Sequence, residues 1–350
     1  MKLYPNISWF FCTWIVSLLL IALFGFFSPL KVNNNTFFES LGGWDGAHYV
    51  GIAEFGYSEK FQLAFFPLYP LTIFLLTKIT TNYLLSAILI SGISSFFAMH
   101  FLYKLVKLDF DKIIAEKAIY YLLIFPTSFF LLIAYSEGLF LLLTILTFYY
   151  FRKGNILLSV IFCALATLTR PVGVALALAL ILQTIISGRF RQHWYIIFSF
   201  FGIFIYCIYL YQATSDPLYF LTAEKHWQRE LSIPGLSFFE SLRSLFTVGF
   251  LDKNFNLLKD FLFAFLGIGL SLRSFRFLPS VYALFSLISI LIPLSTNTVI
   301  SFPRFLLSTF PLFILLALIK NQKVTFLLNL LFPMILGLFI ALFINGYWVS

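Results

Sequence analysis

Charged residues are scarce in this chain. Asp, Glu, Lys and Arg make up 11% of its 350 residues, against about a quarter in an ordinary soluble domain. Hydrophobic residues make up 61%, and apolar runs recur from one end of the sequence to the other. The scarcity of charge excludes a soluble domain between these runs, and the runs themselves predict an all-α polytopic membrane protein.

Cysteine is equally rare. Cys12, Cys163 and Cys207 lie inside apolar runs, and no paired cysteine or histidine spacing of the kind that binds zinc occurs. The sequence therefore predicts neither a disulfide framework nor a zinc site. No residue is assigned as a metal ligand, and the sequence does not decide whether a divalent metal is required.

Acidic residues number 14 against 23 Lys and Arg, which gives a formal net charge of +9. Such a balance can indicate nucleic-acid binding. Here, however, the basic residues form short clusters between apolar runs, as the positive-inside rule produces. No basic face exists that could follow a phosphate backbone. Nucleic acid is therefore excluded as a partner, and membrane lipids are expected instead.

Hydropathy predicts about 11 transmembrane helices in a single integral-membrane domain, residues 1–350. The first is expected to be a retained anchor, because no small-residue cleavage site follows it. The expected spans lie near residues 9–30, 83–106, 118–135, 138–151, 156–169, 172–187, 194–212, 258–272, 278–295, 305–319 and 323–345.

Residues 63–80 are ambiguous, because they are apolar but contain Pro67, Pro70 and Lys78. As a span they would put several basic clusters outside, whereas as a re-entrant or interfacial hairpin they keep those clusters inside. The charge distribution favours the hairpin and leaves the span open as the alternative. The favoured threading puts a first loop with short interfacial helices, 31–82, and a long loop, 213–257, on the outer face, where we expect the active site.

The segment WDGAHY, residues 44–49, is a polar and aromatic island in the first outer loop. Asp45 and His48 stand three residues apart, so on a helix they share a face, and a carboxylate there could act as a general base. Alternatively, Asp45 caps a short helix that Gly56 ends, with Trp44 and Tyr49 as interface anchors. The two interpretations are compatible, because a capping aspartate can also be catalytic.

Tyr135, Ser136 and Glu137 join two apolar runs through almost no loop. Ser136 could be a helix N-cap, with Glu137 on the positive end of the helix. A carboxylate at membrane depth usually has a partner, however, and marks a functional cavity. Both interpretations remain open for Glu137.

Two arginines adjoin prolines in the sequence. Arg170, before Pro171, could cap the C-terminus of the preceding helix. Arg304, after Pro303, is expected at a helix start, where a cation opposes the helix dipole. A bound phosphate or a carboxylate partner would explain an arginine in that position.

Residues 225–230, KHWQRE, carry mixed charges within the long outer loop. They fit a solvated amphipathic helix. They also fit a lid over an outer cavity, in which Lys225 and Arg229 would meet a lipid phosphate while His226 and Trp227 would contact a sugar.

These motifs together resemble the PIG-V-type mannosyltransferases (GPI mannosyltransferase II-like) in a compact prokaryotic form, within the GT-C class of multi-span glycosyltransferases. The eukaryotic relatives add the second mannose to glycosylphosphatidylinositol (GPI) anchors. The ordered match covers about half of the chain, and its first and third pieces are the most specific. The matching pieces are WDGAHY at 44–49 with GY at 56–57, FFPLYP at 65–70, FPTSFF at 125–130 with YSE at 135–137, and LTRPVG at 168–173.

The resemblance implies a GT-C-like bundle that moves a hexose, with mannose expected, from a polyprenyl-phosphate donor by an inverting single displacement. Asp45 would be the base, with His48 as the second catalytic candidate. The chain is shorter than the eukaryotic pattern and departs from it at Pro171, so a glycolipid or cell-envelope glycan acceptor in a prokaryotic plasma membrane is expected rather than a GPI anchor. Donor phosphate contacts are assigned to Arg304, Arg170, Lys225 and Arg229, and substrate contacts to Trp44, Tyr49, Tyr135, Glu137, His226 and Trp227.

The main alternative is a lipid or polysaccharide transporter or flippase without chemistry. A transporter should carry charges deep within its spans and, where it is built from inverted halves, an internal repeat. The sequence has no internal repeat, and deep charges look nearly absent. A ligand-binding membrane scaffold would not need the Asp45 and His48 pair.

Overall fold

The computed structural model describes residues 5–28, 35–247 and 254–349 of the chain. In these residues the regular structure is helical, and one isolated antiparallel bridge joins Leu231 to Thr296. The all-α prediction is therefore confirmed. The chain divides into two compact units whose segments alternate along the sequence. Unit 1 comprises Met1–Gly56, Tyr69–Tyr149 and Phe313–Val349, and unit 2 comprises Tyr57–Leu68 and Tyr150–Leu312.

Four helical segments in the described residues are long and apolar enough to cross a membrane, which supports an integral membrane protein. Four further apolar helices are shorter. At 1.5 Å per residue, such helices run only about 20 Å, less than the ~30 Å of a hydrocarbon core. The predicted count of about 11 spans is therefore not confirmed. The four long segments are Ile7–Phe26, Tyr83–Val106, Trp194–Thr214 and Gln322–Ile344, and the four shorter helices are α4 (Leu68–Thr80), α8 (Ile156–Thr167), α9 (Gly173–Ile186) and α14 (Ser280–Leu294).

Prolines divide two of the predicted spans. The expected span 118–135 becomes helix α6 (Lys112–Ile124), which ends before Pro126, and a separate 3-10 turn η2 (Ser128–Leu131). The expected span 305–319 becomes α15 (Phe302–Leu307) and α16 (Pro311–Ala317). Proline lacks the amide hydrogen that continues a helix, and its ring clashes with the preceding turn. Apolar composition alone therefore overstated the length of these helices.

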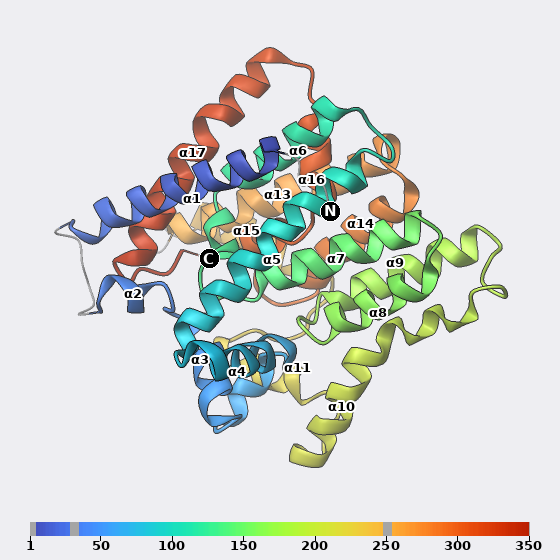
Figure 1. The fold of residues 1–350 in the computed structure, drawn as a ribbon, viewed down its shortest axis with the longest axis horizontal. Coiled ribbons are helices and arrows are strands. Elements are labelled where there is room, and N and C mark those ends of the chain that lie inside the picture. The colour runs from blue at the N-terminus through green and yellow to red at the C-terminus, as the bar shows by residue number, and fades with distance from the viewer. Residues whose placement is uncertain (1–4, 29–34, 248–253, 350) are drawn as a thin grey trace. The chain divides into compact units, whose positions relative to one another are not determined.

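Unit 1 is built on helices from both ends of the chain. Helix α1 (Pro5–Phe26) packs against α17 (Gln322–Ile344), and the two run close together in Figure 1. The Asn345 side-chain amide donates to the Gly25 carbonyl at 2.9 Å and joins their ends. Helix α5 (Tyr83–Val106) packs against α6, and α7 spans Glu137–Arg152. The segment 31–82, predicted as the first outer loop, contains α2 (Phe37–Ser40), α3 (Asp45–Phe55) and α4, which are the short helices that the sequence predicted. Its residues 31–34 lie outside the described residues.

In unit 2, α14 packs between α9 and α13 (Asn254–Phe277), and α8 packs against α9. A second contact joins α8 to α10 (Phe201–Thr214), where a Cβ on Gly202 would stand 1.9 Å from the Ala164 carbonyl oxygen. Only glycine fits so close an approach. The long predicted loop 213–257 contains α11 (Tyr219–Ala223), the 3-10 turn η4 (Glu224–Trp227) and α12 (Leu236–Thr247), and its residues 248–253 lie outside the described part.

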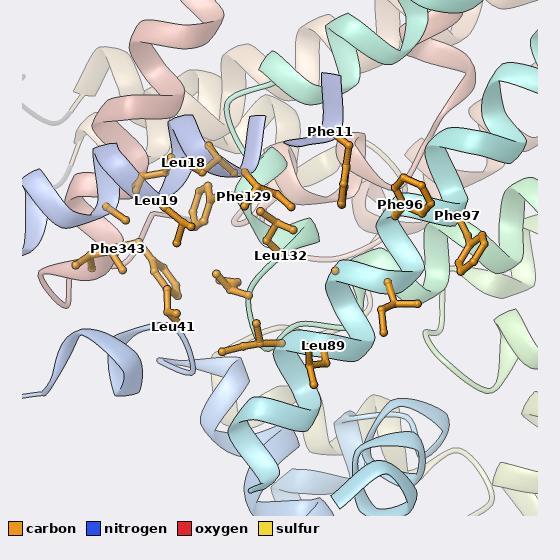
Figure 2. Close-up of a pocket in the computed structure, with 18 residues that line it drawn as sticks. Phe11, Leu18, Leu19, Leu41, Leu89, Phe96, Phe97, Phe129, Leu132 and Phe343 are labelled. Carbon is orange, nitrogen blue, oxygen red and sulfur yellow. The ribbon is translucent and has the colours of Figure 1, made fainter. Parts of the chain in front are cut away.

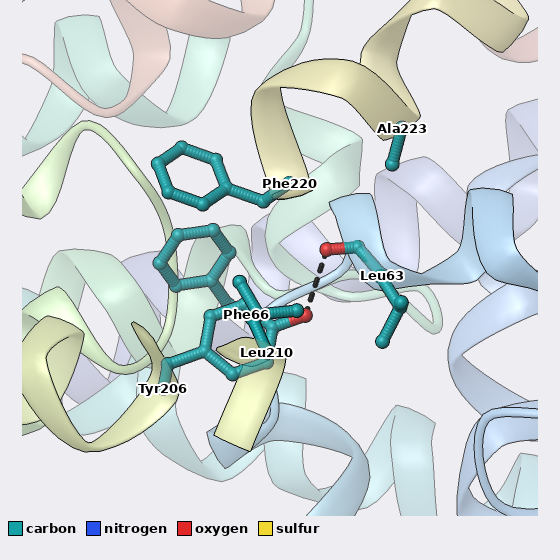
Figure 3. Packing of buried hydrophobic residues seen from close by; sticks show 6 residues of the cluster. All are labelled: Leu63, Phe66, Tyr206, Leu210, Phe220 and Ala223. Atoms are coloured by element: carbon teal, nitrogen blue, oxygen red, sulfur yellow. Dashed lines mark hydrogen bonds between the residues drawn. The ribbon is translucent and has the colours of Figure 1, made fainter. Parts of the chain in front are cut away.

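A small aromatic core holds this loop in unit 2 (Figure 3). Tyr206 and Leu210 of α10 pack against Phe66 and against Phe220 of α11. The Tyr206 hydroxyl donates to the carbonyl of Leu63, in the 3-10 turn η1 (Lys60–Ala64), at 2.7 Å. The segment before α4 and the start of the long loop are thereby fixed to α10.

Candidate active site

Helix α3 begins at Asp45 with an unusual backbone. The preceding residue, Trp44, has φ +56°, a left-handed conformation that is strained for a large side chain. Trp44 occupies the N-cap position and its side chain makes no capping hydrogen bond, so Asp45 is the first residue of the helix and the interpretation of Asp45 as the N-cap is wrong. Asp45 and His48 are both partly exposed, one helical turn apart. Gly56 ends α3 with φ +76°, as predicted.

The start of α3 lies directly against the turn before α7. A Cβ on Gly46 would stand 3.1 Å from the Ala134 carbonyl oxygen, which leaves little room for a larger residue. The Tyr135 hydroxyl donates to the Gly43 carbonyl at 3.2 Å, and the Ala134 amide donates to the Leu41 carbonyl at 3.2 Å. The structure thus brings together the island at 44–49 and the segment at 135–137.

Hydroxyl groups extend this contact into the interior of unit 1. The Tyr49 hydroxyl bonds to the Ser136 hydroxyl at 2.9 Å. The Ser91 hydroxyl donates to the Tyr135 carbonyl at 2.8 Å and can accept from Tyr69 at 2.7 Å. The rings of Tyr49 and Tyr69 meet edge to face, 5.0 Å apart. We call Tyr49, Tyr69, Ser91 and Ser136 the hydroxyl network.

Glu137 lies in the first turn of α7 and is only 1% exposed. It interacts electrostatically with Tyr69, so it belongs to the surroundings of the hydroxyl network. Burial raises the pKa of the Tyr69 phenol well above its usual value, and the nearby Tyr49 and Glu137 act in the same direction. Tyr69 therefore stays a neutral hydrogen-bonding group.

Sequence reasoning missed Ser91. The signal that could have found it is the set of four buried serines on α5: Ser86, Ser91, Ser94 and Ser95. Hydroxyl residues repeated along one apolar helix are typical of contacts between membrane helices. Tyr69 lies within the motif FFPLYP at 65–70, but nothing in the sequence distinguishes it from the other residues of that motif.

An apolar cavity of about 530 Å³ lies beside the same turns of unit 1 (Figure 2). Helices α1, α5 and α17 and the segment around η2 line it, and every lining side chain is apolar. Leu41 and Ile133 form part of its wall. Leu41 also accepts the hydrogen bond from Ala134 described above. A hydrocarbon chain suits this lining, whereas a polar ligand would find no hydrogen-bond partner there.

Arg170 lies in unit 2, in the turn between α8 and α9. It is buried, and its carbonyl accepts from the Gly173 amide at 3.0 Å. The Leu68 amide donates to the Leu168 carbonyl at 3.1 Å, which brings the end of the segment 65–68 to the start of the segment 168–173.

The segment Lys225–Trp227 forms one 3-10 turn rather than the amphipathic helix that the sequence allowed. It ends at Gln228, whose φ is +56°. His226 stacks on Phe61 with ring centres 4.3 Å apart, and Trp227 meets the edge of the same ring. Lys225 pairs with Glu230 at 3.6 Å where both side chains are exposed.

Arg229 and Arg304 approach the same turn of unit 2. The Arg229 guanidinium donates to the Ile300 carbonyl at 2.7 Å, and the Arg304 amide donates to the Ser301 carbonyl at 3.0 Å. Backbone hydrogen bonds between residues 230–232 and 295–297 hold the two segments together. Helix α15 has only six residues. Arg304 is the third residue of this helix, so the prediction that it stands at a helix start is confirmed.

A buried ion pair beside this turn was missed entirely. Lys259 and Asp260 on α13 stand 3.6 Å apart, and both are almost fully buried. The Asp260 carboxylate lies near the Ser301 backbone and near Arg229. The expectation that charges deep within the spans are nearly absent stays a prediction, because α13 is not one of the four segments long and apolar enough to cross a membrane. The available signal was the pair of adjacent charged residues, Lys259 and Asp260, within an apolar run. The high average hydropathy of that run led us to overlook them.

No three His, Cys, Asp or Glu side chains in the described part of the chain come together as a metal site requires. Unit 1 holds the candidates Asp45 and His48 beside the hydroxyl network, and unit 2 separately holds Arg229 and Arg304 at the Ser301 turn.

Comparison with known proteins agrees with the motifs between residues 44 and 173. The family described as "Mannosyltransferase (PIG-V)" matches residues 16–195, just over half of the chain. Human GPI alpha-1,6-mannosyltransferase 2 is 32% identical over 166 residues, which cover 42% of this chain and 34% of the human protein. The match thus spans about a third of the length of that relative. No solved structure matches the chain. The chain belongs to the PIG-V mannosyltransferase family.

Proposed function

We propose that this protein is a membrane-embedded glycosyltransferase that moves a hexose, with mannose expected, from a polyprenyl-phosphate donor to a glycolipid or cell-envelope glycan. The observation that carries the proposal is the convergence in unit 1. Three family-like segments of the sequence, around residues 44–49, 69 and 135–137, join through the hydroxyl network beside Asp45.

Asp45 is proposed as the general base. It lies at the start of α3, partly exposed, where an acceptor can reach it. The carboxylate takes the proton from the acceptor hydroxyl while that oxygen attacks the anomeric carbon. The bond from the anomeric carbon to the donor oxygen breaks, and its electron pair leaves with the phosphate. Attack from the side opposite the phosphate inverts the anomeric centre. His48, one turn along α3, would orient the acceptor.

Arg304 and Arg229 are proposed to stabilise the leaving phosphate, with Arg170 and Lys225 as further candidates. A guanidinium forms two parallel hydrogen bonds with a phosphate, and this interaction strengthens as negative charge develops. Arg304 is 9% exposed, so little water screens its charge. Lys225 is the weakest of the four candidates, because it is exposed and already paired with Glu230.

The aromatic candidates divide by burial. Trp44 is 44% exposed and could lie against a sugar ring. Tyr49, Tyr135 and Glu137 are buried and would support the island rather than touch substrate. His226 and Trp227 pack on Phe61 and would act only at the edge of a substrate site. The apolar cavity of unit 1 would take a hydrocarbon chain of a lipid-linked substrate.

The test of this function is transfer of a labelled sugar by purified protein. Incubation with radiolabelled polyprenyl-phosphate mannose and membrane lipid extract should yield a new labelled product on thin-layer separation.

A lipid or polysaccharide transporter is the second candidate, favoured by the buried charges of Lys259 and Asp260. A transporter would leave the donor chemically unchanged but move it across the membrane of a reconstituted vesicle.

The outer-face location of the site is a separate part of the proposal. Single cysteines at Ser58, Ser232 and Asp111, in a chain lacking its three native cysteines, can be labelled with an impermeant maleimide on intact cells. Positions 58 and 232 should react and position 111 should not, because the basic clusters place residue 111 inside. Reaction at position 111 would overturn the threading.

A further inference from the structure

The segment that follows α17 is fixed in direction by the way this helix ends. Gly346 has φ +90°, a left-handed conformation that favours glycine. The amide of the following residue donates back to the Leu342 carbonyl at 3.0 Å, as in the Schellman motif that ends many helices. The Asn345 side-chain amide ties the same turn to the Gly25 carbonyl at 2.9 Å. The next residue along the chain is Trp348, so its position is set by these contacts.

Trp348 lies against Trp44, the residue that directly precedes Asp45. The two indole rings meet edge to face, with their centres 5.2 Å apart. Phe343, near the end of α17, contacts the Tyr135 ring with centres 6.1 Å apart and also lines the apolar cavity (Figure 2). The end of α17 and the segment after it therefore pack against the island at 44–49, within unit 1. They do so from a part of the chain that the family match at 16–195 does not reach.

Trp44 combines a strained backbone with an exposed ring. Its φ of +56° is rare for a large side chain, and such a conformation persists only where the surroundings enforce it, often at a functional site. The Trp44 carbonyl accepts the Ala47 amide at 3.0 Å, so this residue also begins α3 and places Asp45. The side chain nevertheless remains 44% exposed. The contact with Trp348 thus holds a broad aromatic surface open beside the proposed base.

A hexose suits such a surface. One face of a hexose ring presents C–H groups, which pack on the electron-rich face of an indole while the sugar hydroxyls stay in water. An indole offers a large contact area and has only two side-chain torsions to fix. An indole that a second ring already holds loses still less freedom when the sugar binds, and this strengthens binding.

We propose that Trp348 is a positioning residue, which holds the Trp44 ring so that its exposed surface binds a hexose beside Asp45. The sugar of the donor and a sugar of the acceptor present the same C–H face, and the test separates these two sources. The inference rests on the proposed function, because it places this hexose next to the proposed base. It adds a residue that acts through Trp44 and lies outside the family match.

The test measures binding of two pairs of ligands to the purified full-length protein. In the donor pair, mannosyl farnesyl phosphate is compared with farnesyl phosphate, and in the acceptor pair, octyl α-mannoside is compared with octanol. Wild type should bind the sugar-bearing ligand more tightly in at least one pair, and that pair identifies the source of the hexose. Trp348→Leu should reduce this preference on the order of tenfold and leave binding of the sugar-free ligands unchanged.

Three further variants separate positioning from stability. Trp348→Phe keeps a ring that can contact Trp44, so it should retain most of the preference for the sugar and a melting temperature near that of wild type. Trp348→Leu added to Trp44→Leu should lower the preference no further than Trp44→Leu alone, because both changes act through the same ring. The matched control is Tyr347→Leu, which removes a 40% exposed aromatic side chain from the same segment. This control should bind all four ligands as wild type does.

Each contrary result has a distinct meaning. If wild type shows no preference for the sugar in either pair, Trp44 binds no hexose and the inference fails. Sugar transfer by the same preparation would then show that the proposed function survives without it. If wild type prefers the sugar and Trp348→Leu prefers it equally, the positioning role fails, and additive losses in the double variant would also contradict it. A lowered melting temperature with equal losses for both members of a pair would make the two tryptophans structural anchors only.

Discussion

In unit 2, we call Arg229, Lys259, Asp260 and Arg304 the charged cluster. The charged cluster and the hydroxyl network of unit 1 hold their candidate residues by different means. In the hydroxyl network, neutral groups are joined through short hydrogen bonds, and the buried Glu137 lies nearby. In the charged cluster, the Arg229 guanidinium donates to the Ile300 carbonyl and Lys259 pairs with Asp260. Hydrogen bonds between neutral groups suit a rigid support for a proton-accepting residue, whereas cations such as Arg229 and Arg304 suit an anion such as phosphate.

The two regions share strained backbone next to a candidate residue. Trp44, with φ +56°, directly precedes Asp45, and Ser301, with φ +68°, comes three residues before Arg304. Such conformations cost on the order of 1–3 kcal/mol and persist only where the surroundings enforce them. The hydrogen bonds from the Tyr135 hydroxyl to the Gly43 carbonyl and from the Arg229 guanidinium to the Ile300 carbonyl are the local contacts next to these residues.

The largest expected effect is at Asp45. Asp45→Asn keeps the size of the side chain and removes the charge that accepts a proton, so sugar transfer should fall by on the order of 10²-fold or more. The melting temperature should change little, because Asn keeps the size of Asp and a side-chain oxygen that can accept hydrogen bonds. Activity and thermal unfolding of the same purified variant provide the check. Near-native turnover would show that the base lies elsewhere.

A smaller effect is expected in the charged cluster. Arg304→Lys keeps one positive charge but loses the paired hydrogen bonds to phosphate. The donor Michaelis constant should rise on the order of tenfold, while turnover at saturating donor and the melting temperature change little. Donor titrations of wild type and variant measure this. A lowered melting temperature with an unchanged Michaelis constant would instead indicate that Arg304 serves the fold.

The smallest effect on chemistry, and the clearest on stability, is expected at Ser91. Ser91→Ala removes the link between Tyr69 and the Tyr135 carbonyl, which should cost about 1–3 kcal/mol and lower the melting temperature by a few degrees. Ser94→Ala is the matched control, because Ser94 is a buried serine on the same helix outside the hydroxyl network. Equal melting temperatures for the two variants would mean that the network does not support the island.

The sequence predicted the helical class, the short helices of the first outer loop and the end of α3 at Gly56, because these depend on composition and local turn chemistry. The predicted number of spans is not confirmed, and hydropathy averaged over breaks such as those at Pro126 and Pro311. The sequence could not identify Ser91 as a partner of Tyr69, because that contact joins helices far apart in the sequence. Lys259 and Asp260 were also overlooked, because hydropathy averaged over an apolar run hides two adjacent charged residues.

The measurement that tests the proposed chemistry most directly is the anomeric configuration of the product, determined by nuclear magnetic resonance against that of the donor. A single displacement with Asp45 as base places the new bond on the face opposite the departing phosphate, so the product should have the inverted configuration. A product with the donor's configuration would require a different mechanism, and it would contradict the role proposed for Asp45.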